Sequence, residues 1–165
     1  MTNNLADELR TESIVTLAEV SDWREALTVA GDALVAGHVT TDDYTAEMIA
    51  TVDELGPYIV IAPGIALAHS RPSPAVLRAG ISWVSLATPI AFGHPTNDPV
   101  SLVIGLAAVD HDSHLNTMSA LAEVLSDEVA LAELLAAETP AQVLELLTGF
   151  GSGQEDSPRN PLLTN

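Results

Sequence analysis

Apolar residues recur every three or four positions in two segments of the N-terminal third. This spacing is typical of amphipathic helices and predicts one helix over 22–36 and a second over 41–55. Ser21 precedes the first helix as a candidate N-cap, and Gly56 with Pro57 ends the second. The residues that carry the two patterns are Trp23, Leu27, Ala30 and Leu34, and then Tyr44, Met48, Val52 and Leu55.

The middle of the chain changes to short apolar and β-branched segments separated by Pro, Gly, Asn and Asp, which predict strands. The segment 100–109 is almost entirely apolar, as expected for a central strand covered on both faces. Helical patterns on either side predict an α/β fold: a single domain with a mixed sheet of about five strands sandwiched between helices. The predicted strands are 13–20, at an edge, then 58–62, 64–69, 80–86, 89–92 and 100–109.

After Asp110 the pattern returns to helix, with an apolar stripe made by Leu115, Met118, Ala122 and Leu125. A further helix is predicted to begin at 126–128 and to continue over 129–137. Thr139 and Gln142 then fit a capping box that opens a last helix, which is predicted to end at about Leu147. The residues that follow are rich in Gly, Ser, Pro and Asn, so we expect a domain over 1–148 and a flexible tail over 149–165.

The chain carries a formal net charge of −18, with five arginines and no lysine among its 165 residues. Such a surface disfavours nucleic acid and anionic membranes and favours a basic protein partner. No apolar stretch reaches the roughly 18 residues of a membrane-spanning helix, and the N-terminus has no secretory pattern. Cysteine is absent, which excludes disulfides and thiolate chemistry. These features predict a cytoplasmic protein.

Three of the five histidines lie where predicted elements meet. His111 and His114 follow the apolar strand 100–109 at the start of a helix, where ligands collect in α/β folds. If the strand 64–69 lies beside it, His69 faces the same helix start. A neutral imidazole can attack phosphorus, and Arg71 can clamp the phosphoryl oxygens. The sequence thus permits a phosphoryl-transfer site, whereas His38 and His94 are expected to be exposed.

The same residues permit two other interpretations. His69, His111 and His114 with Asp110 and Asp112 offer nitrogen and oxygen ligands that could bind zinc or another divalent ion. Alternatively, an aspartate caps the helix and the imidazoles make ordinary hydrogen bonds.

Three segments of the sequence resemble a known protein family. They are DWREALTVAGDALVAGHVTTDDYTAEMIATVDELG, GPYIVIAPGIALAHSRPSPAVLRAGIS and PIAFGHPTNDPVSLVIGLAAVDHDSHLNTMSALAEVLSD. Together they closely resemble the enzyme IIA proteins of the bacterial sugar phosphotransferase system (PTS), in the mannitol/fructose superfamily and nearest its ascorbate-type branch. The resemblance covers about residues 13–148.

The resemblance implies a phosphoryl carrier that needs no cofactor. His69 takes the acceptor position, phosphorylated by the small carrier HPr, and passes the group to the cysteine of a IIB component, which serves a membrane IIC transporter. His114 matches the second active-site histidine, and Ser70, Arg71 and Ser113 would lie against the phosphate. The IIA component need not touch the sugar. The oligomeric state stays open, a homodimer included.

This chain departs from the family pattern at three positions. Ala68 replaces the proline that usually precedes the acceptor histidine, Thr51 stands near the place of a helix arginine in mannitol-type members, and His111 is an additional imidazole. We expect Arg71 to take over the role of the missing arginine. Two alternatives remain beside the carrier: a regulatory IIA-like phosphoprotein that is not coupled to transport, and a His/Asp metal-binding protein.

Overall fold

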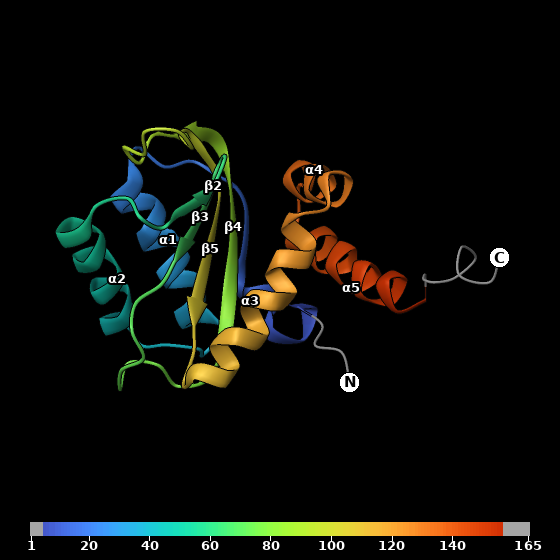
Figure 1. Ribbon diagram of the computed structural model, residues 1–165, viewed down its shortest axis with the longest axis horizontal. Helices are drawn as coiled ribbons and strands as arrows, with labels where there is room; N and C mark the ends of the chain where they lie inside the picture. Colours follow the sequence, from blue (N-terminus) through green and yellow to red (C-terminus); the bar gives the residue numbers. More distant parts are fainter. Residues whose placement is uncertain (1–4, 157–165) are drawn as a thin grey trace.

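The computed structural model describes residues 5–156 and contains a five-stranded mixed sheet in the order β1-β4-β5-β3-β2 (Figure 1). β4 and β5 pair antiparallel, as do β2 and β3, whereas β1 is parallel to β4 and β3 is parallel to β5. The strand bounds are β1 Ile14–Ala18, β2 Val60–Ala62, β3 Ile65–Ala68, β4 Gly80–Ile90 and β5 Val100–Ala107.

Helices cover both faces of the sheet, as the sequence predicts. α1 and α2 lie on one face, and α3, α4 and α5 lie on the other (Figure 1). Their bounds are α1 Trp23–Ala36, α2 Asp42–Leu55, α3 His111–Leu125, α4 Glu128–Ala136 and α5 Pro140–Asp156, preceded by the short 3-10 helices η1 Leu5–Glu8 and η2 Thr11–Ser13. None of the helices within the described part of the chain is long and apolar enough to span a membrane.

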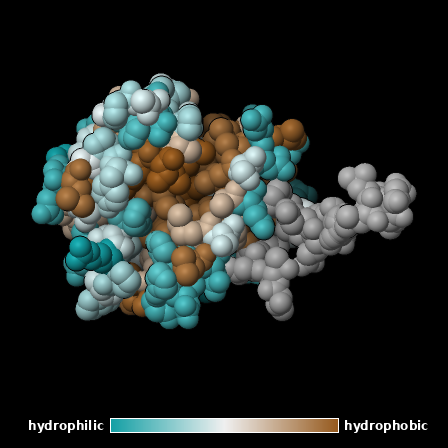
Figure 2. Space-filling model, viewed as in Figure 1, coloured by the Kyte–Doolittle hydropathy of each residue, from teal (hydrophilic) through white to brown (hydrophobic). Residues whose placement is uncertain are grey.

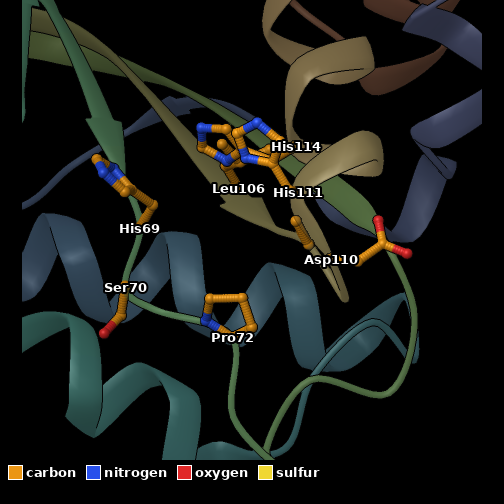
Figure 3. Close-up of a pocket in the computed structure, with 8 residues that line it drawn as sticks. His69, Ser70, Pro72, Leu106, Asp110, His111 and His114 are labelled. Carbon is orange, nitrogen blue, oxygen red and sulfur yellow. The ribbon is translucent and has the colours of Figure 1, made fainter.

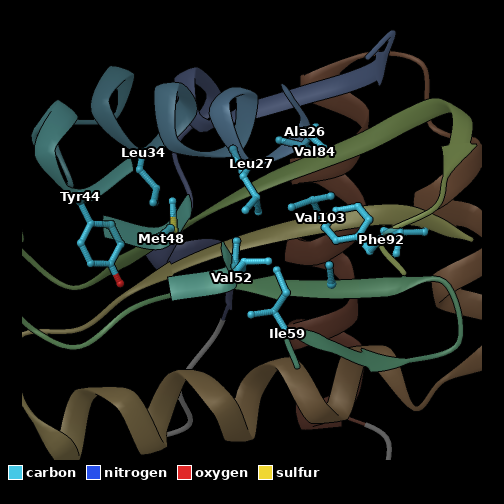
Figure 4. Packing of buried hydrophobic residues seen from close by; sticks show 14 of the residues in the cluster. Ala26, Leu27, Leu34, Tyr44, Met48, Val52, Ile59, Val84, Phe92 and Val103 are labelled. Atoms are coloured by element: carbon cyan, nitrogen blue, oxygen red, sulfur yellow. The ribbon is translucent and has the colours of Figure 1, made fainter. Parts of the chain in front are cut away.

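The sheet separates two hydrophobic cores, which explains why β5 is apolar along its length. Val103 of β5 belongs to the core under α1 and α2 (Figure 4), while its neighbours Leu102 and Ile104 belong to the core under α3 to α5. Successive side chains of a strand point to opposite faces, so a strand covered on both faces has no polar side. β5 is the central strand, as predicted.

Two element boundaries differ from the predictions. Asp22 rather than Ser21 caps α1, because its carboxylate accepts from the backbone N–H of Glu25 while Ser21 lies one residue too early and bonds the Glu25 carboxylate instead. The two strands predicted over 80–86 and 89–92 form the single strand β4, whose pairing with β5 is irregular before Ile90.

The C-terminal helices differ in two further respects. Leu115, expected in the buried stripe of α3, is 50% exposed, whereas Thr117 is buried because its hydroxyl bonds the Glu8 carboxylate. α5 does not end at Leu147 but continues to Asp156. The rest of the predicted tail, residues 157–165, lies outside the described residues.

Candidate active site

The parallel pairing of β3 and β5 brings the histidine segments together. Ala68 at the end of β3 is in register with Gly105 of β5. His69 follows β3, and α3 begins at His111 shortly after β5 ends at Ala107. Carboxyl ends of neighbouring parallel strands meet at one sheet edge, and this edge is where ligands bind in α/β folds. The predicted meeting of His69 with the start of α3 is therefore confirmed.

A hydrogen bond to the backbone determines the tautomer of His69. Its Nδ1 lies 2.8 Å from the carbonyl oxygen of Leu67. A carbonyl can only accept, so Nδ1 carries the proton and Nε2 of the neutral ring carries the lone pair. The half-buried ring also meets the edge of Tyr58, with centroids 5.7 Å apart. The end of β3 therefore holds an oriented imidazole whose unprotonated Nε2 lies on the side of the ring opposite this backbone contact.

His69, His111 and His114 line the same pocket, which has a volume of about 240 Å³ (Figure 3). His69 comes from the end of β3, while both other imidazoles come from the first turn of α3. The remaining lining residues are Ser70, Pro72, Leu106, Ala108 and Asp110. A small pocket with several imidazoles on its wall can hold a compact anion beside His69.

A larger groove of about 800 Å³ continues from His69 towards α2. Arg71 is exposed in this groove and, within the described residues, has no hydrogen-bond or ion-pair partner. Thr51 lines it too, with its hydroxyl oxygen 3.4 Å from that of Ser70. The groove therefore contains Arg71 and the threonine that stands near the expected helix arginine.

Ser113 and Asp110 form the N-terminal cap of α3. The backbone N–H of Ser113 donates to Oδ1 of Asp110 at 2.8 Å, and its hydroxyl oxygen accepts from the backbone N–H of Asp110 at 3.4 Å, so the two residues form a capping box that opens α3. The hydrogen bond from the Ser113 N–H is the main cause of a lowered pKa of the Asp110 carboxyl. Ser113 lines neither the pocket nor the groove. It therefore orients the first turn that carries His111 and His114.

Tyr44 is a site residue that sequence reasoning places only in the core. Its phenol oxygen accepts from the backbone N–H of Ser70 at 2.9 Å, and its O–H donates to the carbonyl of Leu106 at 2.9 Å. The side chain thus joins the residue after His69 to β5, the strand that leads to α3. Apolar periodicity identifies Tyr44 as buried, but no sequence signal reports which distant backbone groups its hydroxyl meets.

The buried phenol should titrate abnormally. Burial is the main cause that raises the pKa of Tyr44 from 10.0 to about 12. The folded state therefore holds this proton more tightly than the unfolded chain, so the contribution to stability is complete below pH 10.0 and is lost as the pH rises through about 12. In Tyr58→Phe, which leaves Tyr44 as the sole tyrosine, phenolate absorbance should appear only near pH 12. Ionisation near pH 10.0 with the fold intact would contradict this assignment.

The other two histidines lie away from the pocket. His38 is exposed at the end of α1 with a positive φ of 62°. His94 is half-buried in the loop between β4 and β5, where its Nδ1 accepts from the backbone N–H groups of Thr96 and Asn97. His94 therefore has a structural role, and its predicted exposure is wrong because its ring nitrogen accepts hydrogen bonds from its own loop.

The metal-binding alternative gains no support from the geometry. Within residues 5–156, no group of three or more His, Cys, Asp or Glu side chains is placed to hold a metal ion. Asp110 instead caps α3, as one of the interpretations of the sequence expects.

A comparison with protein families identifies the chain. Residues 8–149 match the family described as "Phosphoenolpyruvate-dependent sugar phosphotransferase system, EIIA 2". The protein belongs to this family, and its resemblance to the enzyme IIA proteins is confirmed. It is 37% identical to the "Ascorbate-specific PTS system EIIA component" of Salmonella choleraesuis over 145 residues, which are 87% of this chain and 94% of that protein.

Solved structures share the fold. The mannitol-specific cryptic phosphotransferase enzyme IIA CmtB from Escherichia coli superposes with a TM-score of 0.79 at 31% identity, over 89% of this chain and 99% of that one. Enzyme IIAMTL from Escherichia coli, in its complex with phosphorylated enzyme IIBMTL, gives a TM-score of 0.74 at 27% identity, over 86% of this chain and 99% of that one. The chain therefore has the mannitol-type IIA fold.

Proposed function

We propose that this protein is a phosphoryl carrier that accepts the phosphoryl group of phospho-HPr on Nε2 of His69 and donates it to a IIB component. The observation that carries the proposal is the hydrogen bond between Nδ1 of His69 and the Leu67 carbonyl, which leaves Nε2 unprotonated at the wall of the pocket. Family membership supports the same conclusion, because the matching family is a component of a phosphotransferase system.

The two transfers balance without a cofactor. In the first, the Nε2 lone pair of His69 forms a bond to phosphorus while the P–N bond of phospho-HPr breaks and its electron pair returns to the donor imidazole. In the second, the thiolate of the IIB cysteine attacks phosphorus and the electron pair of the P–N bond returns to Nε2 of His69. Positioning and charge stabilisation supply most of the catalysis in phosphoryl transfer.

The surrounding residues take the supporting roles. His114 donates to a phosphoryl oxygen from the first turn of α3, Ser70 donates its hydroxyl, and Arg71 supplies positive charge from the groove. Ser113 acts through the cap of α3 rather than by contact with the phosphate. We assign the phosphotransfer domain to residues 1–148 and the reaction to the cytoplasm.

Apolar surface near the site supports a protein partner. Leu55 and Tyr58 line the groove and are 65% and 41% exposed, and Ile61 of the neighbouring edge strand β2 is 46% exposed. Figure 2 shows hydrophobic residues gathered in the middle of one face with hydrophilic residues around them. Exposed apolar patches with polar rims are typical of protein–protein contacts. We propose HPr and a IIB component as the protein partners. The similarity to ascorbate-specific relatives favours ascorbate-type uptake through a membrane IIC transporter.

The carrier function is tested by intact-mass analysis after incubation with phosphoenolpyruvate, enzyme I and HPr, followed by addition of an ascorbate-type IIB protein. We expect an acid-labile gain of one phosphoryl group, which then moves to IIB. No uptake would refute phosphorylation. Uptake without transfer to IIB would refute the carrier role and favour the regulatory phosphoprotein.

Arg71→Gln should slow phosphorylation of His69. A charge-assisted hydrogen bond is worth about 1.5–3 kcal/mol, so the rate should fall about tenfold to a hundredfold. Rapid-quench measurement of phosphoryl transfer from phospho-HPr would give the rate. Arg24→Gln is the matched control, since Arg24 pairs with Asp53 on the surface of α1 and α2. An unchanged rate in Arg71→Gln would remove this side chain from the site.

A further inference from the structure

We propose, resting on the proposed function, that His111 is a second phosphoryl-binding imidazole, which contacts the group on His69 beside His114 and stabilises the phosphorylated form. His111 is an addition to the family pattern, and it lines the same pocket as His69 and His114.

His111 and His114 belong to the same face of α3. Residues three apart in a helix are neighbours on its surface, and both side chains line the pocket that contains His69. Figure 3 shows the two imidazoles side by side, opposite the strand end that carries His69. Among the described residues neither ring has a hydrogen-bond partner. Both can therefore turn a ring nitrogen towards a group bound at Nε2 of His69.

Phosphorylation gathers negative charge in the pocket. A phosphoryl group adds a charge of about −1.5 to −2 near neutral pH. Asp110 adds a further negative charge on the pocket wall, and the hydrogen bond from Ser113 lowers the pKa of this carboxyl, so it stays ionised. A second hydrogen-bond donor on the α3 side therefore stabilises the phosphorylated form beyond what His114 supplies.

No other cationic side chain of the described residues lines the pocket. Arg71 lines the groove, which it shares with His69 and His114, and does not line the pocket that contains His111. Apart from the histidines, the side-chain donor on the pocket wall is the hydroxyl of Ser70, which is neutral. On the α3 side, the side chains that can donate a hydrogen bond to the phosphoryl group are therefore the two imidazoles, and His111 supplies the second one.

The proposal is tested by the phosphorylation equilibrium between phospho-HPr and this protein, without IIB. His111→Ala should lower the equilibrium constant about fivefold, the size expected for a charge interaction at an exposed position. His111→Gln should restore part of the loss, because its amide can still donate to a phosphoryl oxygen. The phosphorus NMR resonance of phospho-His69 should also shift in His111→Ala, a change that a purely structural role would not produce.

His94→Ala is the matched control, because His94 lies in the loop between β4 and β5, and it should leave both readouts unchanged. His111 is exposed and Asp110 caps the helix, so the variants should fold, as circular dichroism can verify. An unchanged equilibrium and an unchanged resonance in His111→Ala would overturn this inference alone. Failure of the wild-type protein to take up phosphate would instead overturn the proposed function.

Discussion

His69→Ala should abolish the acid-labile gain of one phosphoryl group from phosphoenolpyruvate, enzyme I and HPr. The nucleophile carries the covalent intermediate, so its loss should lower the rate at least about a thousandfold. Intact-mass analysis of the variant beside the wild type measures the effect. The half-buried ring makes a single hydrogen bond to Leu67, so its removal should leave the fold intact.

The control is His94→Ala, which removes an imidazole from a loop away from the pocket and should leave uptake at the wild-type level. His114→Ala should reduce the rate but retain phosphorylation, because this side chain assists without forming the bond. Undiminished uptake in His69→Ala, or uptake that disappears only in His114→Ala, would assign the acceptor to another histidine.

The sequence predicts the sheet and the meeting of the histidines because local signals suffice for both. An apolar strand such as β5 requires cover on both faces, and Asp110 at a strand end marks the start of a helix. The strand end before His69 and the first turn of α3 then lie at one sheet edge, provided that β3 is the parallel neighbour of β5. Local sequence patterns cannot predict that β3 and β5 are neighbouring strands.

The sequence does not predict the burial of Thr117 or the site role of Tyr44, because both depend on side-chain partners that are distant in sequence. The buried position of Thr117 depends on Glu8, and the role of Tyr44 depends on Ser70 and Leu106. Periodicity reports the spacing of apolar residues but cannot show that a polar residue is buried when its partner comes from another segment. Ser113 shows the converse: its hydroxyl oxygen accepts from the backbone N–H of Asp110 in the local helix cap, and Ser113 does not line the pocket.

Trp83→Ala should cause a large loss of stability. Trp83 is fully buried in β4, between Ile14 of β1 and Ile104 of β5. Removing a buried aromatic side chain costs about 3–5 kcal/mol, against a total of about 5–15 kcal/mol for a typical domain. Urea unfolding followed by circular dichroism would show a lower midpoint. Trp23→Ala, which removes a partly exposed tryptophan, should cost clearly less.

Trp83→Phe separates the two contributions of this side chain. Within the described residues the indole N–H is buried without a hydrogen-bond partner, which opposes folding by about 1–3 kcal/mol. Phenylalanine keeps most of the ring volume and removes this unsatisfied donor, so the lost packing and the relieved donor should largely cancel. The midpoint of Trp83→Phe should therefore lie close to that of the wild type. A loss as large as that of Trp83→Ala would mean that the indole N–H has a partner, such as a buried water, that stabilises the fold.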